Sequence, residues 1–236
     1  MSELVFVRHG QASFGAESYD KLSASGVHQV KMLAEHWQEL GEQFDFAYSG
    51  TLRRQLETAQ ELLGLVKNTS PKHQTHEGFN EYNGDPLIGI YLRDFAREGG
   101  FDPELRLPIR DERLFQKVFE AATAKWIRDE LQPHTGDQHF ESWRQFQQRV
   151  HSAIDELMAR HSGGSRILIS TSGGVIALAL QRALRFPDTE VIATNWMVHN
   201  SSVTRLRYGN GKISLTMFNS LAHLERPERK HMVTFR

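Results

Sequence analysis

Short apolar runs along the chain alternate with longer stretches of helical spacing. The first run, Leu4 to Val7, is continuous, which is typical of a strand buried on both faces of a parallel sheet. A stretch with helical spacing follows Ser23 and ends at Gly41, a residue suited to a helix C-terminus. A second short strand at 44–48 and a helix from about residue 51 repeat this order. The pattern predicts an α/β fold.

The same alternation returns in the second half of the chain after an interruption. Residues from about 85 to 140 contain a Gly-Gly pair, several prolines and a mostly helical run, and we interpret them as an inserted cap segment. Ser142 and Gln145 have the spacing of a capping box, which predicts the start of a long helix. A buried strand at 167–170 then leads through a tight loop into an apolar helix at 175–184.

Two strand-like segments near the C-terminus, 201–208 and 213–218, flank the sequence Gly-Asn-Gly-Lys. This turn chemistry predicts an antiparallel hairpin at the edge of the sheet. The sequence contains no internal repeat and no long polar linker. We therefore predict a single domain over residues 1–236, a three-layer α/β/α sandwich with a mostly parallel sheet and a mainly helical cap at about 85–140.

Composition narrows the classes of partner. The chain has 28 Lys and Arg residues against 29 Asp and Glu residues, with no basic stripe, so we expect no nucleic-acid partner. No apolar run approaches the length of a membrane span, and we expect no membrane partner. Cysteine is absent, which excludes disulfides, thiolate metal sites and cysteine catalysis. We expect a cytoplasmic protein that acts on a small substrate. The sequence does not decide between a monomer and a homodimer.

Two of the predicted strands end in polar loops that contain glycine, Arg8-His9-Gly10 and the segment 171–174. The carboxyl ends of parallel strands lie at one edge of a sheet, and ligands bind there. Glycine lets the backbone approach a ligand closely, and the helix after the second loop offers free amides and a positive dipole end. We therefore expect this edge of the sheet to bind an anion.

The pair Arg8 and His9 suits phosphate chemistry. A guanidinium group can bind two phosphate oxygens, and an imidazole can attack phosphorus and carry the phosphoryl group. The triplet is a weak signal by itself, because three specified residues recur by chance and a histidine at a strand end is more often only hydrogen-bonded.

The context of this triplet resembles the histidine phosphatase, or phosphoglycerate mutase-like, superfamily. Its signature is an apolar strand followed by Arg-His-Gly and usually Glu or Gln, and this chain has Val7-Arg8-His9-Gly10-Gln11. Further segments resemble the motifs Asp-x-Leu-Ser/Thr-x-x-Gly, Ser-x-x-Leu-x-Arg-Ala-x-x-Thr-Ala, Leu-x-Glu and Glu-Ser-Trp/Phe. In this chain they are Asp20-Lys-Leu-Ser-Ala-Ser-Gly26, Ser49-Gly-Thr-Leu-Arg53-Arg54-Gln-Leu-Glu-Thr58-Ala59, Phe79-Asn-Glu81 and Glu141-Ser-Trp143.

The resemblance implies a phosphoglycerate mutase-like fold and a role for each matching residue. It implies His9 as the nucleophile and Glu81 as the general acid that protonates the leaving oxygen. Arg8 and Arg54 would bind phosphate, and the spacing to the Thr-Ala pair favours Arg54 over Arg53. Two arginines can neutralise the phosphoryl oxygens while the imidazole attacks in line.

One position departs from the family pattern. The family normally has a second histidine after the late buried strand, and this chain has Ser172 at that position. We expect Ser172 and the next residue, Gly173, to bind phosphate. A serine hydroxyl donates one hydrogen bond but brings no positive charge. The loss of one such donor costs about 3 kcal/mol, or roughly a hundredfold in rate. His199 or His223 could reach the same pocket, although we interpret His199 as an ordinary strand-end residue.

Other chemistries have weaker support. The chain has 12 histidines, but the motif His-Glu-x-x-His is absent, and His73-Gln-Thr-His76 lacks a convincing set of carboxylate partners. The glycine-rich loops that bind nucleotides are absent too, so we expect no metal and no cofactor. We predict a metal-independent phosphatase that hydrolyses a small phosphomonoester through a phosphohistidine on His9. Phosphoglycerate mutase-type transfer and, because of Ser172, a low-activity phosphate-binding regulatory protein are the alternatives.

Overall fold

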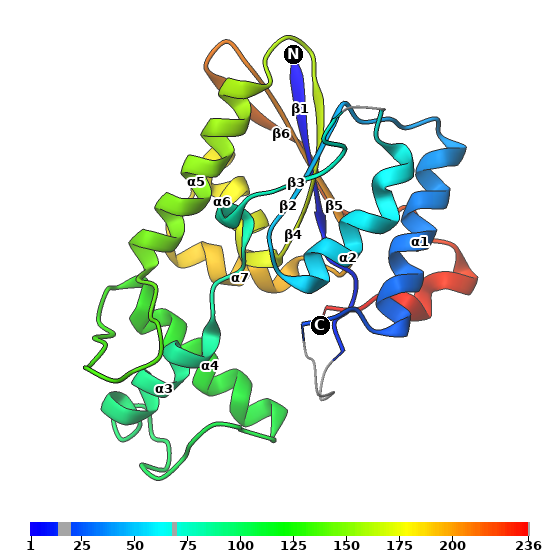
Figure 1. The fold of residues 1–236 in the computed structure, drawn as a ribbon. Helices are drawn as coiled ribbons and strands as arrows, with labels where there is room; N and C mark the ends of the chain where they lie inside the picture. The colour runs from blue at the N-terminus through cyan, green and yellow to red at the C-terminus, as the bar shows by residue number, and fades with distance from the viewer. Residues whose placement is uncertain (14–19, 68–69, 236) are drawn as a thin grey trace. The chain divides into compact units, whose positions relative to one another are not determined.

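The computed structural model describes residues 1–13, 20–67 and 70–235. The chain forms two compact units, one of Met1–Glu81 with Val150–Arg236 and one of Tyr82–Arg149. The sheet and all the candidate site residues belong to the first unit (Figure 1). The predicted cap at about 85–140 falls within the second unit. That the chain is a single domain with this cap inserted stays a prediction.

A six-stranded sheet organises the first unit, with the strand order β3-β2-β4-β1-β5-β6. Neighbouring strands among the first four are parallel, whereas β5 is antiparallel to β1 and to β6. The strands are β1 (Ser2–Arg8), β2 (Phe46–Ser49), β3 (Gln74–Thr75), β4 (Arg166–Thr171), β5 (Val203–Gly209) and β6 (Lys212–Ser220). The predicted α/β fold with a mixed, mostly parallel sheet is confirmed.

Helices cover both faces of this sheet. In the first unit they include α1 (Ala24–Glu39), α2 (Arg53–Leu62), α6 (Gly173–Leu184) and α7 (Thr189–Met197). Figure 1 shows α1 and α2 on one side of the sheet and α6 on the other. Leu4 and Phe6 are fully buried, and so are Val5 and Val7, which point to the opposite face. Burial on both faces explains why β1 reads as a continuous apolar run.

The boundaries of these elements follow from local side-chain chemistry. The hydroxyl of Ser23 accepts a hydrogen bond from the amide of Gly26 at 3.0 Å, which caps the start of α1. Gly41 follows the same helix with φ +66, a conformation that favours glycine. Asn210 and Gly211 have φ values of 52 and 71, as the turn of the predicted β5–β6 hairpin requires.

The second unit is mainly helical, with α3 (Gly84–Phe95), α4 (Glu112–Ile127) and the start of α5 (Trp143–Arg160), which ends in the first unit. The capping box predicted for α5 is present, because Gln145 Oε1 accepts from the amide of Ser142 at 2.8 Å. The hydroxyl of Ser142 in turn accepts from the amide of Gln145 at 3.3 Å. Aromatic rings form the core of this unit, with Trp126 at 4.9 Å from Tyr82 and 5.1 Å from Trp143 between centroids.

Across the described residues, no helix is long and apolar enough to cross a membrane.

Candidate active site

The carboxyl end of β1 leads directly into the Arg8-His9-Gly10 loop, which is held by backbone hydrogen bonds. The amide of His9 donates to the carbonyl of Thr171 at 2.8 Å, and the amide of Gly10 donates to Thr58 Oγ1 at 3.2 Å. The carbonyl of His9 accepts from Asn200 Nδ2 at 3.2 Å. The strand β4, the helix α2 and the segment before β5 therefore fix the position from which the His9 side chain projects.

The tautomer of His9 follows from its contacts. Its Nδ1 lies 2.7 Å from the carbonyl oxygen of Gly10, which can only accept, so Nδ1 carries the proton. Its Nε2 lies 3.2 Å from Nε of Arg54, which can only donate, so Nε2 presents a lone pair. Burial lowers the pKa of His9 well below its usual value, and the charges of Arg54 and Arg8 act in the same direction. The imidazole is therefore neutral, as a nucleophile must be.

Two glycines allow the His9 loop to pack directly against α1. A Cβ atom at Gly10 would lie 2.4 Å from the carbonyl oxygen of Gly26. A Cβ atom at Gly26 would lie 2.1 Å from the carbonyl oxygen of Gln11. The hydroxyl of Ser23 also donates to Gln11 Oε1 at 2.9 Å. The spacing of the Asp20–Gly26 segment thus serves to seat the helix against the loop that carries His9.

Arg54, and not its neighbour Arg53, reaches His9 from the first turn of α2. The Arg54 side chain is 13% exposed and its Nη1 lies 2.6 Å from Oδ1 of Asp20. The Arg53 side chain is 57% exposed and pairs with Glu57 at 2.7 Å on the outer face of the helix. The structure therefore places at His9 the arginine that the motif spacing favours, while the role of Arg54 in binding phosphate stays a prediction.

Arg8 supplies a second positive charge near His9. Its Nη1 donates to the carbonyl of Val198, and its charge contributes to the lowered pKa of His9. The neutral imidazole thus lies in a positive field from two guanidinium groups, which suits an anionic ligand.

Glu81 lies at the N-terminus of α6. Its Oε2 accepts a hydrogen bond from the amide of Gly174 at 2.9 Å, so a carboxylate already occupies part of the anion site that this loop suggested. Gly173 is closely packed as well, because a Cβ atom there would lie 2.2 Å from Oδ1 of Asn195. The structure brings Glu81 to the same loop as Ser172 and Gly173, and their roles toward a substrate stay predictions.

Ser172 is buried and follows β4 directly. Arg8 is paired with Thr171 in the β1–β4 ladder, so His9 and Ser172 leave the sheet side by side. The hydroxyl of Ser172 does not cap α6 but accepts a hydrogen bond from Gln55 Nε2 at 2.9 Å. Gln55 is a residue that the sequence did not point to. The only available signal was its place between Arg54 and Thr58.

The two histidines considered as substitutes for the missing imidazole have other partners. The Nε2 of His223 lies 2.8 Å from the hydroxyl of Ser201. The Nδ1 of His199 lies 2.9 Å from Nδ2 of Asn219, and its ring lies 4.0 Å from that of Phe235 between centroids, tilted by 36°. These contacts agree with His199 as an ordinary structural residue.

His223 makes folding stability depend on pH. Burial lowers its pKa to about 3, and the nearby His36 and Arg229 act in the same direction. Between about pH 6.5 and about pH 3 the unfolded chain therefore binds a proton that the folded protein does not bind, so stability falls as the pH falls through this range. We expect the free energy of unfolding to fall by about 1 kcal/mol more in wild type than in His223→Gln between about pH 6 and about pH 5. Urea unfolding at each pH measures this difference.

The matched control for this experiment is His28→Gln on the exposed face of α1, which should keep the wild-type pH dependence. If His223→Gln also kept it, His223 would be protonated in the folded protein and the lowered pKa would be wrong.

Two further features bear on the location of the site. Among the described residues, no group of three His, Asp, Glu or Cys side chains is arranged to hold a metal ion.

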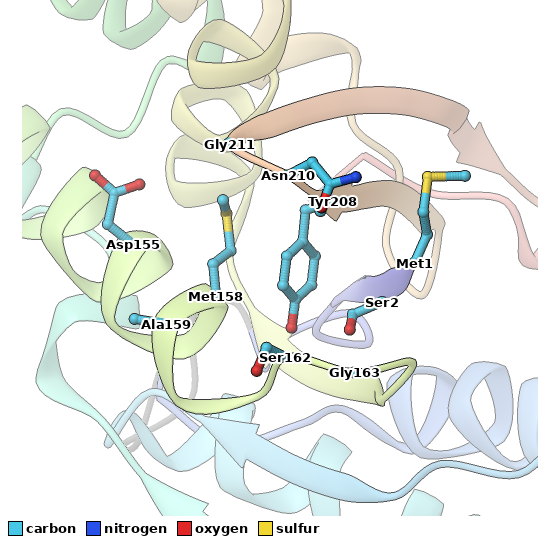
Figure 2. A pocket seen from close by; sticks show the side chains of 11 residues that line it. Met1, Ser2, Asp155, Met158, Ala159, Ser162, Gly163, Tyr208, Asn210 and Gly211 are labelled. Atoms are coloured by element: carbon cyan, nitrogen blue, oxygen red, sulfur yellow. The ribbon is translucent and has the colours of Figure 1, made fainter.

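Figure 2 shows a pocket at the other end of β1, lined by residues that include Met1, Asp155, Met158 and Tyr208. His9 follows the opposite end of that strand, roughly 20 Å away at about 3.3 Å per residue. This pocket is therefore separate from the candidate active site.

The family model described as histidine phosphatase superfamily (branch 1) matches residues 4–103 and 110–221. Among solved structures, a phosphoserine phosphatase mutant from Entamoeba histolytica in complex with phosphoserine is 20% identical, with a TM-score of 0.62 over 95% of this chain and 100% of that one. A phosphoglycerate mutase from Bacillus anthracis is also 20% identical, with a TM-score of 0.60 over 94% of each chain.

A mycobacterial glucosyl-3-phosphoglycerate phosphatase with inorganic phosphate is 21% identical, with a TM-score of 0.62 over 94% of this chain and 99% of that one. At this level of identity the likeness to solved structures establishes the fold.

Proposed function

We propose, since the chain belongs to the histidine phosphatase superfamily (branch 1), that it hydrolyses small phosphomonoesters through a phosphohistidine on His9. The observation that carries the proposal is the tautomer of His9. A neutral imidazole has its Nε2 lone pair facing the guanidinium of Arg54, inside a field of two positive charges. Such a pair of a nucleophile and a phosphate-binding cation suits in-line attack on phosphorus.

In the first step the bound phosphoryl group displaces Arg54 Nε from the lone pair of His9 Nε2. His9 Nε2 then forms a bond to phosphorus while the bond from phosphorus to the ester oxygen breaks. Arg8 and Arg54 stabilise the charge on the phosphoryl oxygens. Glu81 gives its proton to the leaving oxygen, so that an alcohol leaves rather than an alkoxide. A carboxyl group can do this while its Oε2 accepts from Gly174, because the proton sits on the other oxygen.

In the second step water attacks phosphorus, the bond to Nε2 breaks, and inorganic phosphate leaves. The ionised Glu81 now takes a proton from the attacking water, which restores the starting state of the site. Phosphorylation at Nε2 places positive charge on the imidazole, and the contact of Nδ1 with the carbonyl of Gly10 stabilises that charge.

Small phosphorylated metabolites are the substrate class that we propose. The solved relatives include proteins in complex with phosphoserine and with 3-phosphoglyceric acid, both compact anionic monoesters. A mutase-type transfer stays the alternative, because a phosphoglycerate mutase is among the structural relatives.

Phosphate release from a panel of phosphomonoesters tests this proposal. We expect purified protein to release inorganic phosphate from phosphoserine, 3-phosphoglycerate or 4-nitrophenyl phosphate in the presence of a chelator. Acid-labile phosphate on the protein should appear during rapid-quench turnover. Interconversion of phosphoglycerates without phosphate release would favour the mutase. Phosphate binding without turnover of any ester would favour the regulatory protein.

A further inference from the structure

Gln55 is a buried amide beside Ser172. It follows Arg54 on α2, and its side chain joins three segments of the chain. Its Nε2 donates to the carbonyl of Phe79 at 3.0 Å and to the hydroxyl of Ser172 at 2.9 Å. Its Oε1 accepts from the amide of Leu52 at 3.3 Å. The residue thus links the helix that carries Arg54 to the loop that carries Ser172.

The orientation of this amide is determined by its partners. The carbonyl of Phe79 can only accept a hydrogen bond, so the NH₂ end of Gln55 must face it. The amide of Leu52 can only donate, so the oxygen end must face Leu52. Gln55 is therefore a donor to Ser172. As a result the Ser172 hydroxyl accepts at this contact, and its own proton points elsewhere.

The remaining proton of Ser172 is well placed to meet a ligand. The hydroxyl does not cap α6, and within the described part of the chain its proton has no hydrogen-bond acceptor. Ser172 leaves β4 beside His9 in the strand register. On the basis of the proposed function, we propose that Gln55 is a positioning residue that aims the Ser172 proton at the phosphoryl group transferred to His9.

The same pair explains how the site accommodates serine. The family pattern has alanine directly after the second arginine and histidine at the position of Ser172, whereas this chain has glutamine and serine. A histidine in the rotamer of Ser172 would place its Cγ near the serine oxygen, 2.9 Å from Gln55 Nε2, which is closer than a non-bonded carbon and nitrogen pack.

Gly50 is fitted to the same amide, because a Cβ atom there would lie 1.9 Å from Gln55 Oε1. The large side chain of Gln55 thus fits between two small residues, Gly50 and Ser172. Gln55 and Ser172 together occupy the space that the family's imidazole would fill. The serine at position 172 therefore depends on the glutamine at position 55.

A double-mutant cycle tests the positioning role. Gln55→Met keeps the volume and removes both donors, and Ser172→Ala removes the hydroxyl. With 4-nitrophenyl phosphate we expect Ser172→Ala to lower kcat by roughly a hundredfold and Gln55→Met by roughly fivefold, with KM nearly unchanged in both. The double variant should be no slower than Ser172→Ala, because the proposed effect of Gln55 on the rate passes through the serine hydroxyl.

The matched controls are Gln60→Met on the exposed face of α2 and Ser152→Ala on the exposed face of α5, and both should keep the wild-type kcat. Wild-type kcat in Gln55→Met, or losses that multiply in the double variant, would overturn the positioning role. Thermal melts identify any variant that has lost its fold.

A histidine introduced at position 172 tests whether Gln55 fills the space of the imidazole ring. Ser172→His alone should be slower than wild type, because Gln55 fills the space of the ring. Ser172→His with Gln55→Ala should be at least roughly tenfold faster than Ser172→His. A faster enzyme from Ser172→His alone, or no gain from the second change, would overturn the inference that the two positions are paired.

Binding of orthovanadate separates this inference from the proposed function. If wild type releases no phosphate, the proposed hydrolysis fails, but titration calorimetry with orthovanadate still reports the hydrogen bond from Ser172. We then expect Ser172→Ala and the double variant to bind orthovanadate more weakly by the same factor. Equal affinity in wild type and Ser172→Ala would show that the serine proton does not face the anion.

Discussion

Replacing His9 with alanine should lower phosphate release at least roughly 10⁴-fold, since the variant lacks the atom that bonds to phosphorus. The acid-labile phosphoenzyme should be absent in rapid-quench experiments. Phosphate binding should persist, because Arg8 and Arg54 stay in place and the His9 ring has few contacts of its own. Steady-state kinetics and phosphate titration measure the two effects separately.

His28→Ala on the exposed face of α1 is the matched control, with a histidine removed from the same unit. It should retain the wild-type rate and the wild-type melting temperature. A His9→Ala protein that kept more than about one hundredth of the wild-type rate would show that another group, or water, attacks phosphorus directly.

Glu81→Gln should slow the enzyme by an amount that depends on the leaving group. With phosphoserine we expect a loss of roughly 10²-fold to 10³-fold, because a serine alkoxide is a poor leaving group without a proton. With 4-nitrophenyl phosphate the loss should be small, since the phenolate leaves unprotonated. Glutamine keeps an oxygen for the amide of Gly174, so the start of α6 should be unchanged. The ratio of kcat on the two esters is the measurement.

Glu35→Gln on the exposed face of α1 serves as the control and should leave both rates unchanged. Equal losses on both esters would contradict proton transfer from Glu81. They would assign to the carboxylate only its contact with α6.

The parts of the fold that could be predicted were those with local signals. The buried runs that became β1 and β4 are apolar on both faces, and few other structures produce such runs. The cap at Ser23, the turn at Asn210-Gly211 and the capping box at Ser142 each depend on residues within a few positions. Helix caps and tight turns can be predicted from a sequence because the residues that form them are only a few positions apart.

Elements that depend on distant contacts gave no such signal. The helix α7 has only Val191 and Ile192 buried, so its sequence carries little periodicity. The strand β3 has two residues and exists because β2 offers it an edge. Gln55 reads as a polar helix residue, yet its partner Ser172 lies 117 positions away. The tautomer of His9 likewise depends on Arg54, which the fold brings to it.

The ion pair between Arg54 and Asp20 affects how tightly the site binds each phosphorylated ligand. The resting site already contains a carboxylate on one of its cations, at 2.6 Å. Any phosphate that binds Arg54 there competes with this internal anion, so the measured affinity is the difference between two ion pairs. A dianionic monoester competes better than a singly charged diester. Inorganic phosphate faces the same competitor when turnover ends, which favours its departure and limits product inhibition.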